Sequence, residues 1–169
     1  MEANEEQIIL VIQKVSDRRR GGFFDVVVTD RRMIVDKLIG GAYWADALRN
    51  DKNSQLQSTV AFGVVGGALS NAANKSAAKS LNKKVAEYLA ECERSGRIEA
   101  ILKMQKKKIV IPHDEVVRAK LSRRCATACY SKMVLKNKGK KRIWVFPREQ
   151  YDAVSSELAK ILKERIKIG

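Results

Sequence analysis

The sequence predicts an α+β protein, mainly β, with about seven antiparallel strands, a C-terminal helix and a long helical insertion between the third and fourth strands. Three observations predict this fold. Short runs rich in β-branched residues, separated by Gly, Asp and Asn turns, lie on both sides of residues 43–97. Apolar residues recur every three or four positions in the latter part of that segment. A second amphipathic stretch begins after Pro147, a residue that suits the first turn of a helix.

The first half of the predicted sheet, residues 6–40, contains three strands joined by tight turns. We expect strands at Glu6–Val15, Phe23–Val28 and Arg32–Ile39, because each run is apolar and β-branched without helical spacing. The second turn is Thr29-Asp30-Arg31, whose short polar side chains can bond their own backbone.

The central segment predicts a helix over Leu69–Cys92, with a stop at Ser95-Gly96. Its apolar stripe is Leu69, Ala73, Ala77, Leu81, Val85, Tyr88 and Cys92, widened by Ala72 and Leu89. Shorter helical stretches are expected at Tyr43–Asn50 and Ile98–Met104.

The second half, residues 103–167, predicts four more strands and the terminal helix. The strands are expected at Lys107–Ile111, Val116–Arg124, Tyr130–Lys136 and Arg142–Phe146. Alternation places Val117, Ala119, Leu121, Met133 and Leu135 inward, with basic residues between them facing outward. The helix should bury Tyr151, Val154, Leu158, Ile161, Leu162 and Ile166.

Two short motifs resemble those of prokaryotic pleckstrin-homology-like (PH-like) domains. Val28-Thr-Asp-Arg-Arg-Met-Ile-Val35 is similar to a hairpin common in them, and Ile111-Pro-His-Asp-Glu-Val-Val117 to a strand connection in which His113 replaces the usual aromatic residue. Phe62-Gly-Val-Val-Gly-Gly67 also resembles a Gly-rich insertion of some members.

The resemblance covers Glu6–Leu162 and implies a PH-like split barrel closed by the C-terminal helix. The chain would be a single domain, 1–169, with the insertion 43–97 between barrel halves 6–40 and 103–167. The family includes lipid binders, peptide binders and modules with no known ligand, so the resemblance implies a binding module without naming its ligand.

Positive charge is concentrated in one part of the chain. The net charge is +15, from 34 basic and 19 acidic residues. Residues 1–55 carry nine of each sign, whereas Lys103–Arg142 carry fourteen basic residues against Asp114 and Glu115, a local charge of +12. Such an excess predicts attraction to an anionic lipid surface or to nucleic acid. The alternative is a charge set that only keeps the protein in solution.

The basic residues at outward positions of three consecutive strands are the candidate anion-binding patch. They are Arg118, Lys120, Arg124, Lys132, Lys136 and Arg142. Six charges near an anionic leaflet supply about 1 kcal/mol each, which corresponds to a dissociation constant on the order of tens of micromolar. Reversible binding to acidic lipid is the leading hypothesis, and nucleic-acid binding through the same patch is the alternative.

The apolar run Val60–Leu69 is a candidate second contact. Phe62, Gly63, Val64 and Gly67 can enter a membrane interface, or they can pack on the sheet or on another copy of the chain. A homo-oligomer through residues 60–92, serving as a protein scaffold, is therefore a third hypothesis. The run is too short to cross a bilayer, which takes about 20 residues.

Catalysis, metals, cofactors and a small-molecule substrate are not expected. His113 has no nucleophile in a recognisable motif beside it, and no metal-ligand spacing occurs. The odd count of three cysteines and the acidic N-terminus favour a cytoplasmic protein, with peripheral attachment to a membrane under the leading hypothesis. Cys125 and Cys129 flank a predicted hairpin, where they are either buried thiols or a bonded pair.

Overall fold

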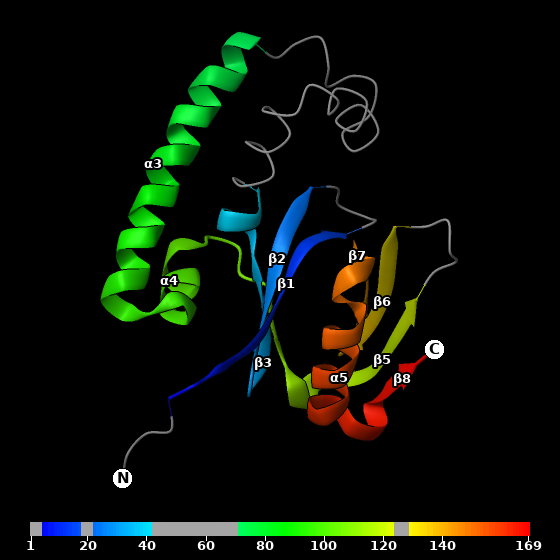
Figure 1. The fold of residues 1–169 in the computed structure, drawn as a ribbon. Coiled ribbons are helices and arrows are strands. Elements are labelled where there is room, and N and C mark those ends of the chain that lie inside the picture. The colour runs from blue at the N-terminus through cyan, green and yellow to red at the C-terminus, as the bar shows by residue number, and fades with distance from the viewer. Residues whose placement is uncertain (1–4, 18–21, 42–70, 124–128) are drawn as a thin grey trace. The chain divides into compact units, whose positions relative to one another are not determined.

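The computed structural model describes residues 5–17, 22–41, 71–123 and 129–169 (Figure 1). The strands are β1 (Ile8–Asp17), β2 (Phe23–Thr29), β3 (Arg32–Asp36), β4 (Val110–Pro112), β5 (Val116–Arg123), β6 (Tyr130–Asn137), β7 (Lys140–Pro147) and β8 (Ile166–Ile168). The helices are α3 (Asn71–Ser95), α4 (Arg97–Met104) and α5 (Tyr151–Leu162), with 3₁₀ turns η1 (His113–Glu115), η2 (Arg148–Gln150) and η3 (Lys163–Arg165). Residues 37–41 are also helical.

The α+β class, the helices between β3 and β4, and the C-terminal helix are confirmed. The strands form one mixed sheet in the order β4-β3-β2-β1-β7-β6-β5-β8. The prediction of seven strands misses β8, which pairs with β5 in parallel. β4 and β8 are the two edges of the sheet in the described part of the chain, so the sheet is partly open.

The chain divides into two compact units. The sheet unit comprises Met1–Arg20, Asp25–Val35 and Ile109–Gly169, and the helical unit comprises Gly21–Phe24 and Asp36–Lys108. The prediction of a single domain stays a prediction. The expected helix at Tyr43–Asn50 lies outside the described residues.

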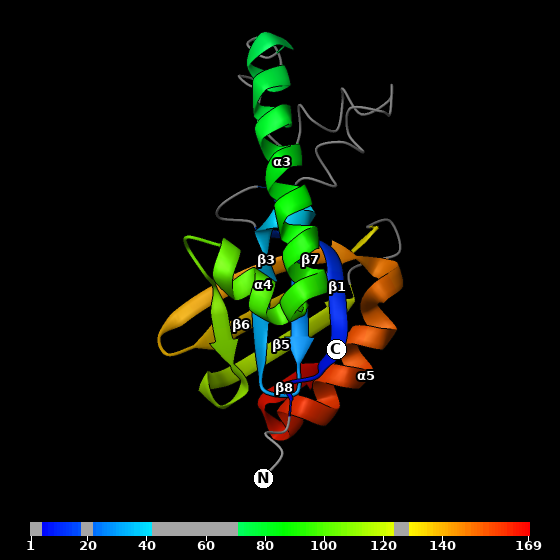
Figure 2. The same ribbon diagram turned by 90° about the vertical axis from the view of Figure 1, so that its left-hand side faces the viewer.

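The core of the sheet unit lies between the inner face of the sheet and α5. In Figures 1 and 2, α5 lies along one side of the sheet, and η3 and β8 follow at its end. The buried residues from β5 to β7 and from α5 are Ala119, Leu121, Met133, Leu135, Trp144, Phe146, Tyr151, Val154, Leu158 and Leu162. Apart from Trp144 and Phe146, for which no inward position was predicted, these residues were all expected to face inward. Three other predicted inward positions, Val117, Ile161 and Ile166, are not buried.

Val117 was expected to face inward and is instead 67% exposed. The register of β5 against β6 shifts between Val116 and Arg118, so one extra residue is present in β5 at this point. A β-bulge of this kind turns a side chain away from the face that simple alternation assigns to it. Val116 takes the buried position, and Val117 and Arg118 are both exposed.

The terminal helix ends earlier than its apolar spacing predicts. Lys163 has φ of 50°, a left-handed conformation that stops the helix after Leu162. Ile161 is half-buried, and Ile166 lies in β8 beside Ala119 rather than on the helix. The chain end thereby becomes an edge strand next to β5.

The two motifs behind the PH-like resemblance meet in the sheet unit. The Thr29 hydroxyl accepts hydrogen bonds from the backbone N–H groups of Arg31 (3.2 Å) and Arg32 (2.9 Å), which fixes the predicted turn. His113 is buried, and its Nε2 lies 2.8 Å from the carbonyl oxygen of Thr29. Because a carbonyl only accepts, Nε2 must carry the proton. His113 therefore joins two strand connections.

In the helical unit, the predicted strand Arg32–Ile39 ends early, at Asp36. One carboxylate oxygen of Asp36 accepts a hydrogen bond from the backbone N–H of Ile39 at 3.4 Å, which favours the start of a helix. The other accepts bonds from the Tyr88 hydroxyl at 3.1 Å and from Arg97 at 3.0 Å. The fully buried Asp36 side chain thus ties residues 37–41 to α3 and α4.

The helix predicted over Leu69–Cys92 is confirmed as α3 where the structure describes it, and its stop at Gly96 is confirmed by a φ of 88°. Tyr88 is buried, as the apolar stripe predicts. Leu89, assigned to the edge of that stripe, is 50% exposed, which corrects the assignment.

Candidate anion-binding face

The register of β5 and β6 defines an outer face of the sheet. Arg118 pairs with Lys136, and Lys120 pairs with Val134. Directly paired residues share one face of a sheet, and neighbours along a strand alternate between faces. Because Ala119 is buried, Arg118, Lys120 and Lys136 lie on the face turned away from the core.

Arg142 does not share this face, which corrects the predicted patch. It pairs with the fully buried Leu135, so it lies on the inner side with Trp144. Lys141 pairs with Lys136 and takes the outward position. A difference of one residue along a strand moves a side chain to the opposite face, and the predicted start of β7 at Arg142 concealed the correct alternation.

The edge strand β8 adds one more cation to the outer face. Lys167 pairs with Lys120 across the parallel β5–β8 ladder. We define the basic face as five exposed residues from four adjacent strands: Arg118, Lys120, Lys136, Lys141 and Lys167. Lys132 pairs with Ser122 on the same side and is half-buried. Arg124 lies outside the described residues.

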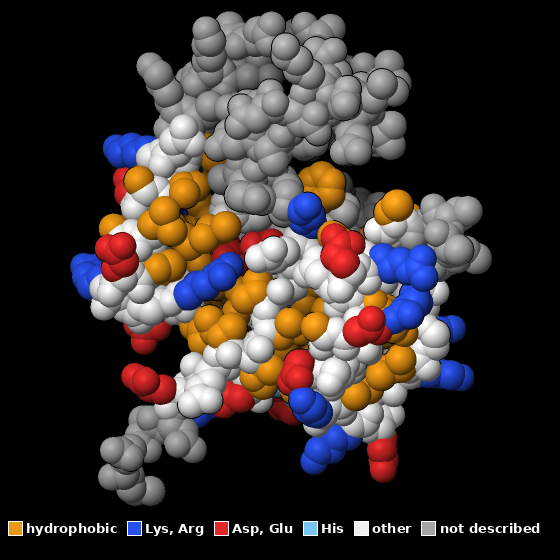
Figure 3. All heavy atoms as spheres, in the orientation of Figure 1, with side chains coloured by type: hydrophobic (Ala, Val, Ile, Leu, Met, Phe, Trp, Pro, Cys, Tyr) orange, Lys and Arg blue, Asp and Glu red, His pale blue; other side chains and the backbone are white. Residues whose placement is uncertain are grey.

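Carboxylates do not neutralise the basic face. Within the described ranges, none of its five side chains has an acidic group within 4.0 Å. The ion pairs nearest along the chain are made by Arg123 with Asp152 and by Lys138 with Glu115. The hydrogen bond that Lys138 donates to the Glu115 carboxylate raises the pKa of Lys138. Figure 3 shows the opposite side of the sheet unit, the side that α5 covers, where Asp and Glu side chains lie among the Lys and Arg side chains.

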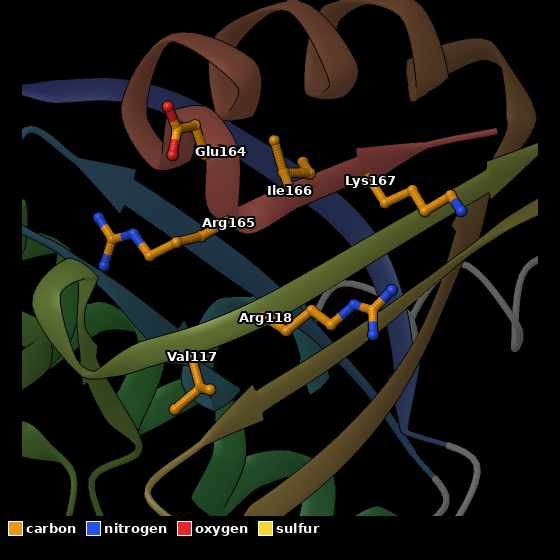
Figure 4. Close-up of a pocket in the computed structure, with 6 residues that line it drawn as sticks. All are labelled: Val117, Arg118, Glu164, Arg165, Ile166 and Lys167. Carbon is orange, nitrogen blue, oxygen red and sulfur yellow. The ribbon is translucent and has the colours of Figure 1, made fainter.

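An open pocket of about 580 Å³ lies at the end of this face, between β5 and the segment η3–β8. Its lining is Val117, Arg118, Glu164, Arg165, Ile166 and Lys167. Figure 4 shows Arg118 and Lys167 extending in the same direction on the two sides of β5. The Glu164 carboxylate points away from both, and Arg165 points toward the other end of the pocket.

Arg165 has a structural role in the wall of the pocket. Its guanidinium donates hydrogen bonds to the backbone carbonyls of His113, at 2.5 Å, and Val116, at 3.3 Å. These contacts hold η3 against the β4–β5 connection. The pocket therefore offers two cations, Arg118 and Lys167, whose donors are available to a ligand.

An exposed apolar residue adjoins the basic residues here. Val117, which lines the pocket with Arg118, is 67% exposed because of the bulge, whereas the exposed Ile168 pairs with the buried Leu121 and lies on the other side of the sheet. Large apolar side chains next to cations are typical of surfaces that meet a membrane interface, where charges bind headgroups and apolar groups enter the acyl boundary.

The other residues that the sequence predicted to make contacts lie off this face or among the residues that the structure does not describe. Phe62, Gly63, Val64 and Gly67 lie outside the described residues, as does Cys125. Cys129 is an exposed thiol, which corrects the expectation of a buried one. Among the residues that the structure describes, no cluster of His, Cys, Asp and Glu suited to a metal ion is present. No described helix is long and apolar enough to span a bilayer.

Sequence reasoning missed three members of the site: Lys141, Lys167 and Val117. The signal for Lys141 was available, because the buried character of Trp144 and Phe146 fixes the alternation of β7. The signals for the other two were weak, since β8 has only three residues and a bulge leaves no mark in the apolar pattern.

A comparison of the sequence with protein-family models gives no match, and a search of the curated proteins finds no relative.

Proposed function

We propose that this protein is a non-enzymatic PH-like binding module whose basic face binds acidic membrane lipid. The observation that carries the proposal is the set of five exposed cations on one side of β5–β8, without acidic neighbours among the described residues. Uncompensated positive charge spread over a sheet face suits an extended anionic surface better than a small enclosed substrate.

The order of elements supports the PH-like part of the proposal. Three strands, a helical segment, further strands and a terminal helix follow each other as in the split barrel that the two motifs imply. β1 also pairs with β7, through Ser16 with Val145 and Asp17 with Trp144, which brings the two halves of the sheet together.

The strength expected of this surface is modest. Five cations at about 1 kcal/mol each give about 5 kcal/mol, or a dissociation constant on the order of 0.2 mM. Burying the exposed part of Val117 in the interface adds roughly 1–2 kcal/mol, which brings the constant to the order of tens of micromolar. Binding of this strength is reversible and sensitive to salt.

Nucleic acid is the second candidate ligand, because the same five cations can contact phosphates. Five contacts predict a slope of about −4.5 in a plot of log affinity against log salt concentration on duplex DNA. Single-strand binding usually needs exposed aromatic side chains for stacking. Trp144, an aromatic residue on one of the strands that carry these cations, is 1% exposed and faces the core. This observation favours lipid over single-stranded nucleic acid.

The test is co-sedimentation with vesicles that contain anionic lipid, compared with neutral vesicles and with a salt-titrated DNA shift. Lys120→Gln with Lys136→Gln removes two charges of the basic face and should weaken vesicle binding by about 30-fold. Lys103→Gln with Lys160→Gln is the matched control, since both lysines are exposed, lie elsewhere and pair with Glu91 and Glu157. The control should bind like the unmodified protein.

Two results would overturn the proposal. Equal weakening by both double variants would mean that total charge, rather than the basic face, attracts the vesicles. Retention of DNA at salt concentrations that abolish vesicle binding would assign the face to nucleic acid. Self-association through residues 60–92 stays a separate prediction, because residues 60–70 lie outside the described residues.

A further inference from the structure

We propose that the pocket between β5 and η3–β8 holds the phosphate of a phosphomonoester lipid headgroup, with Arg118 and Lys167 as its ligands. The inference deepens the proposed function and rests on it, because it names the lipid class that the basic face selects. The basic face attracts anionic lipids in general, and the pocket makes the protein prefer phosphomonoester lipids among them.

The two cations are placed by hydrogen-bonded backbone rather than by flexible loops. Lys167 lies opposite Lys120 in the parallel ladder, and Arg118 lies two residues before Lys120, on the same face. The ladder continues past β8, since the backbone N–H of Gly169 donates to the carbonyl of Leu121 at 3.0 Å. Arg118 and Lys167 are therefore held on adjacent strands and extend in one direction (Figure 4).

The rest of the pocket favours an anion at this end. Arg165 is held at the other end by the carbonyls of His113 and Val116. The one carboxylate in the lining, Glu164, is exposed and directed away from Arg118 and Lys167. A ligand between these two side chains meets positive charge from both and no opposing carboxylate of the lining.

The donors suit a phosphomonoester better than a phosphodiester. A monoester carries a charge of about −1.5 to −2 near neutral pH and presents three terminal oxygens. An arginine guanidinium can bind two of those oxygens in parallel, and a lysine ammonium can bind the third as a point charge. A diester offers one negative charge and two such oxygens, so it leaves part of this donor set unused.

A lipid-borne phosphate fits the pocket better than a free one. The pocket is open, and its volume of about 580 Å³ far exceeds that of a phosphate group. Val117 in its lining is 67% exposed and can enter the acyl boundary while the headgroup is bound. A soluble phosphate would use the two cations but not this apolar contact.

The experiment compares vesicles that contain phosphatidic acid with vesicles that contain phosphatidylglycerol, in a phosphatidylcholine background and at matched surface charge. The unmodified protein should bind the phosphatidic acid vesicles about tenfold more tightly, or better. Arg118→Gln with Lys167→Gln should abolish that ratio. Lys136→Gln with Lys141→Gln removes the same charge from the basic face and should weaken both bindings while keeping the ratio.

Two further measurements separate geometry from charge and lipid from free phosphate. Arg118→Lys keeps the charge but loses the planar fork, so it should lower the ratio without changing binding to phosphatidylglycerol. Glycerol 3-phosphate should compete only at concentrations well above those at which the vesicles bind. Competition at equal phosphate concentration would overturn the assignment to lipid.

The remaining outcomes distinguish the two proposals. Equal binding to both vesicle types would overturn the phosphomonoester site. The proposed function would still stand if Lys136→Gln with Lys141→Gln weakened the binding to these vesicles. Retention of the ratio in Arg118→Gln with Lys167→Gln would also overturn the site. Absence of binding to either vesicle type would overturn the proposed function itself.

Discussion

Replacement of Glu6 by glutamine tests the cluster that fixes the β2–β3 hairpin. The Glu6 carboxylate accepts hydrogen bonds from Arg32 Nη2 at 2.6 Å and Arg32 Nε at 2.9 Å. It also accepts one from the Thr29 hydroxyl at 2.6 Å. The Glu6 and Arg32 side chains are 13% and 30% exposed, so solvent screens the pair only in part.

Glu6→Gln keeps the size of the side chain but removes the charge and one of the two acceptors that Arg32 uses. A hydrogen bond to a charged group contributes about 1.5–3 kcal/mol, so the free energy of unfolding should fall by about 2 kcal/mol near neutral pH. For a chain of 169 residues this corresponds to a decrease of about 4–8 °C in Tm.

The stability that the Glu6 carboxylate contributes should depend on pH in a definite direction. The hydrogen bond from Arg32 lowers the pKa of Glu6 below its ordinary value of 4.5. The stability that the carboxylate contributes is therefore fully present above the unfolded-state pKa and is lost as pH falls through the lower folded-state pKa. The difference between Glu6→Gln and the unmodified protein should be full near neutral pH and should shrink as pH falls below the ordinary carboxyl pKa of 4.5.

Urea unfolding followed by circular dichroism at several pH values measures this difference. Glu157→Gln is the matched control, because Glu157 pairs with Lys160 on the exposed side of α5. An exposed pair of this kind contributes about 0–1 kcal/mol, so the control should change stability little. An effect of Glu6→Gln that is the same at about pH 7 and about pH 3 would refute the role of its charge.

The remaining predictions concern the bulge and the helical unit. Val117→Ala should change the free energy of unfolding by less than about 0.5 kcal/mol, because Val117 is 67% exposed. Leu121→Ala on the same strand should lower the free energy of unfolding by about 2–5 kcal/mol, because Leu121 is buried. Similar losses for the two variants in urea unfolding would contradict the bulge. Tyr88→Phe leaves Asp36 with one donor fewer and should lower stability by about 1–3 kcal/mol in the same assay. Because burial raises the pKa of Tyr88 far above that of a free tyrosine, Tyr88→Phe should also leave the ultraviolet titration of phenolate unchanged up to about pH 11. A loss of titrating absorbance in that range would show that Tyr88 is accessible to water.

The order of elements could be predicted from the sequence because local patterns determine it. Alternation in β6 placed Met133 and Leu135 in the core, and both are buried. The stop of α3 followed from Gly96, which adopts the positive φ that glycine tolerates best. The turn at Thr29 followed from the ability of its hydroxyl to bond nearby backbone N–H groups.

What the sequence could not reveal depends on contacts between distant residues. The exposure of Val117 depends on the register of β5 against β6, which no local pattern contains. The fate of Ile166 depends on the reversal at Lys163 and on pairing with β5. The end of β3 at Asp36 depends on partners in α3 and α4, more than fifty residues away in the case of Tyr88.

In the candidate site, too, the parts set by local sequence could be predicted and the parts set by distant contacts could not. The concentration of charge between Lys103 and Arg142 predicted a basic face on these strands, and the register of β5 against β6 places Arg118, Lys120 and Lys136 on one side of the sheet. Lys167 joins them only because the chain end folds back as β8.

The measurement that tests the central claim most directly is the partition of the unmodified protein between buffer and vesicles as the share of anionic lipid rises from none. Lipid binding through the basic face predicts no retention on pure phosphatidylcholine, retention that increases steeply with anionic lipid, and loss of that retention as salt shortens the Debye length. Retention that is independent of anionic lipid, or absent at every composition in low salt, would contradict it.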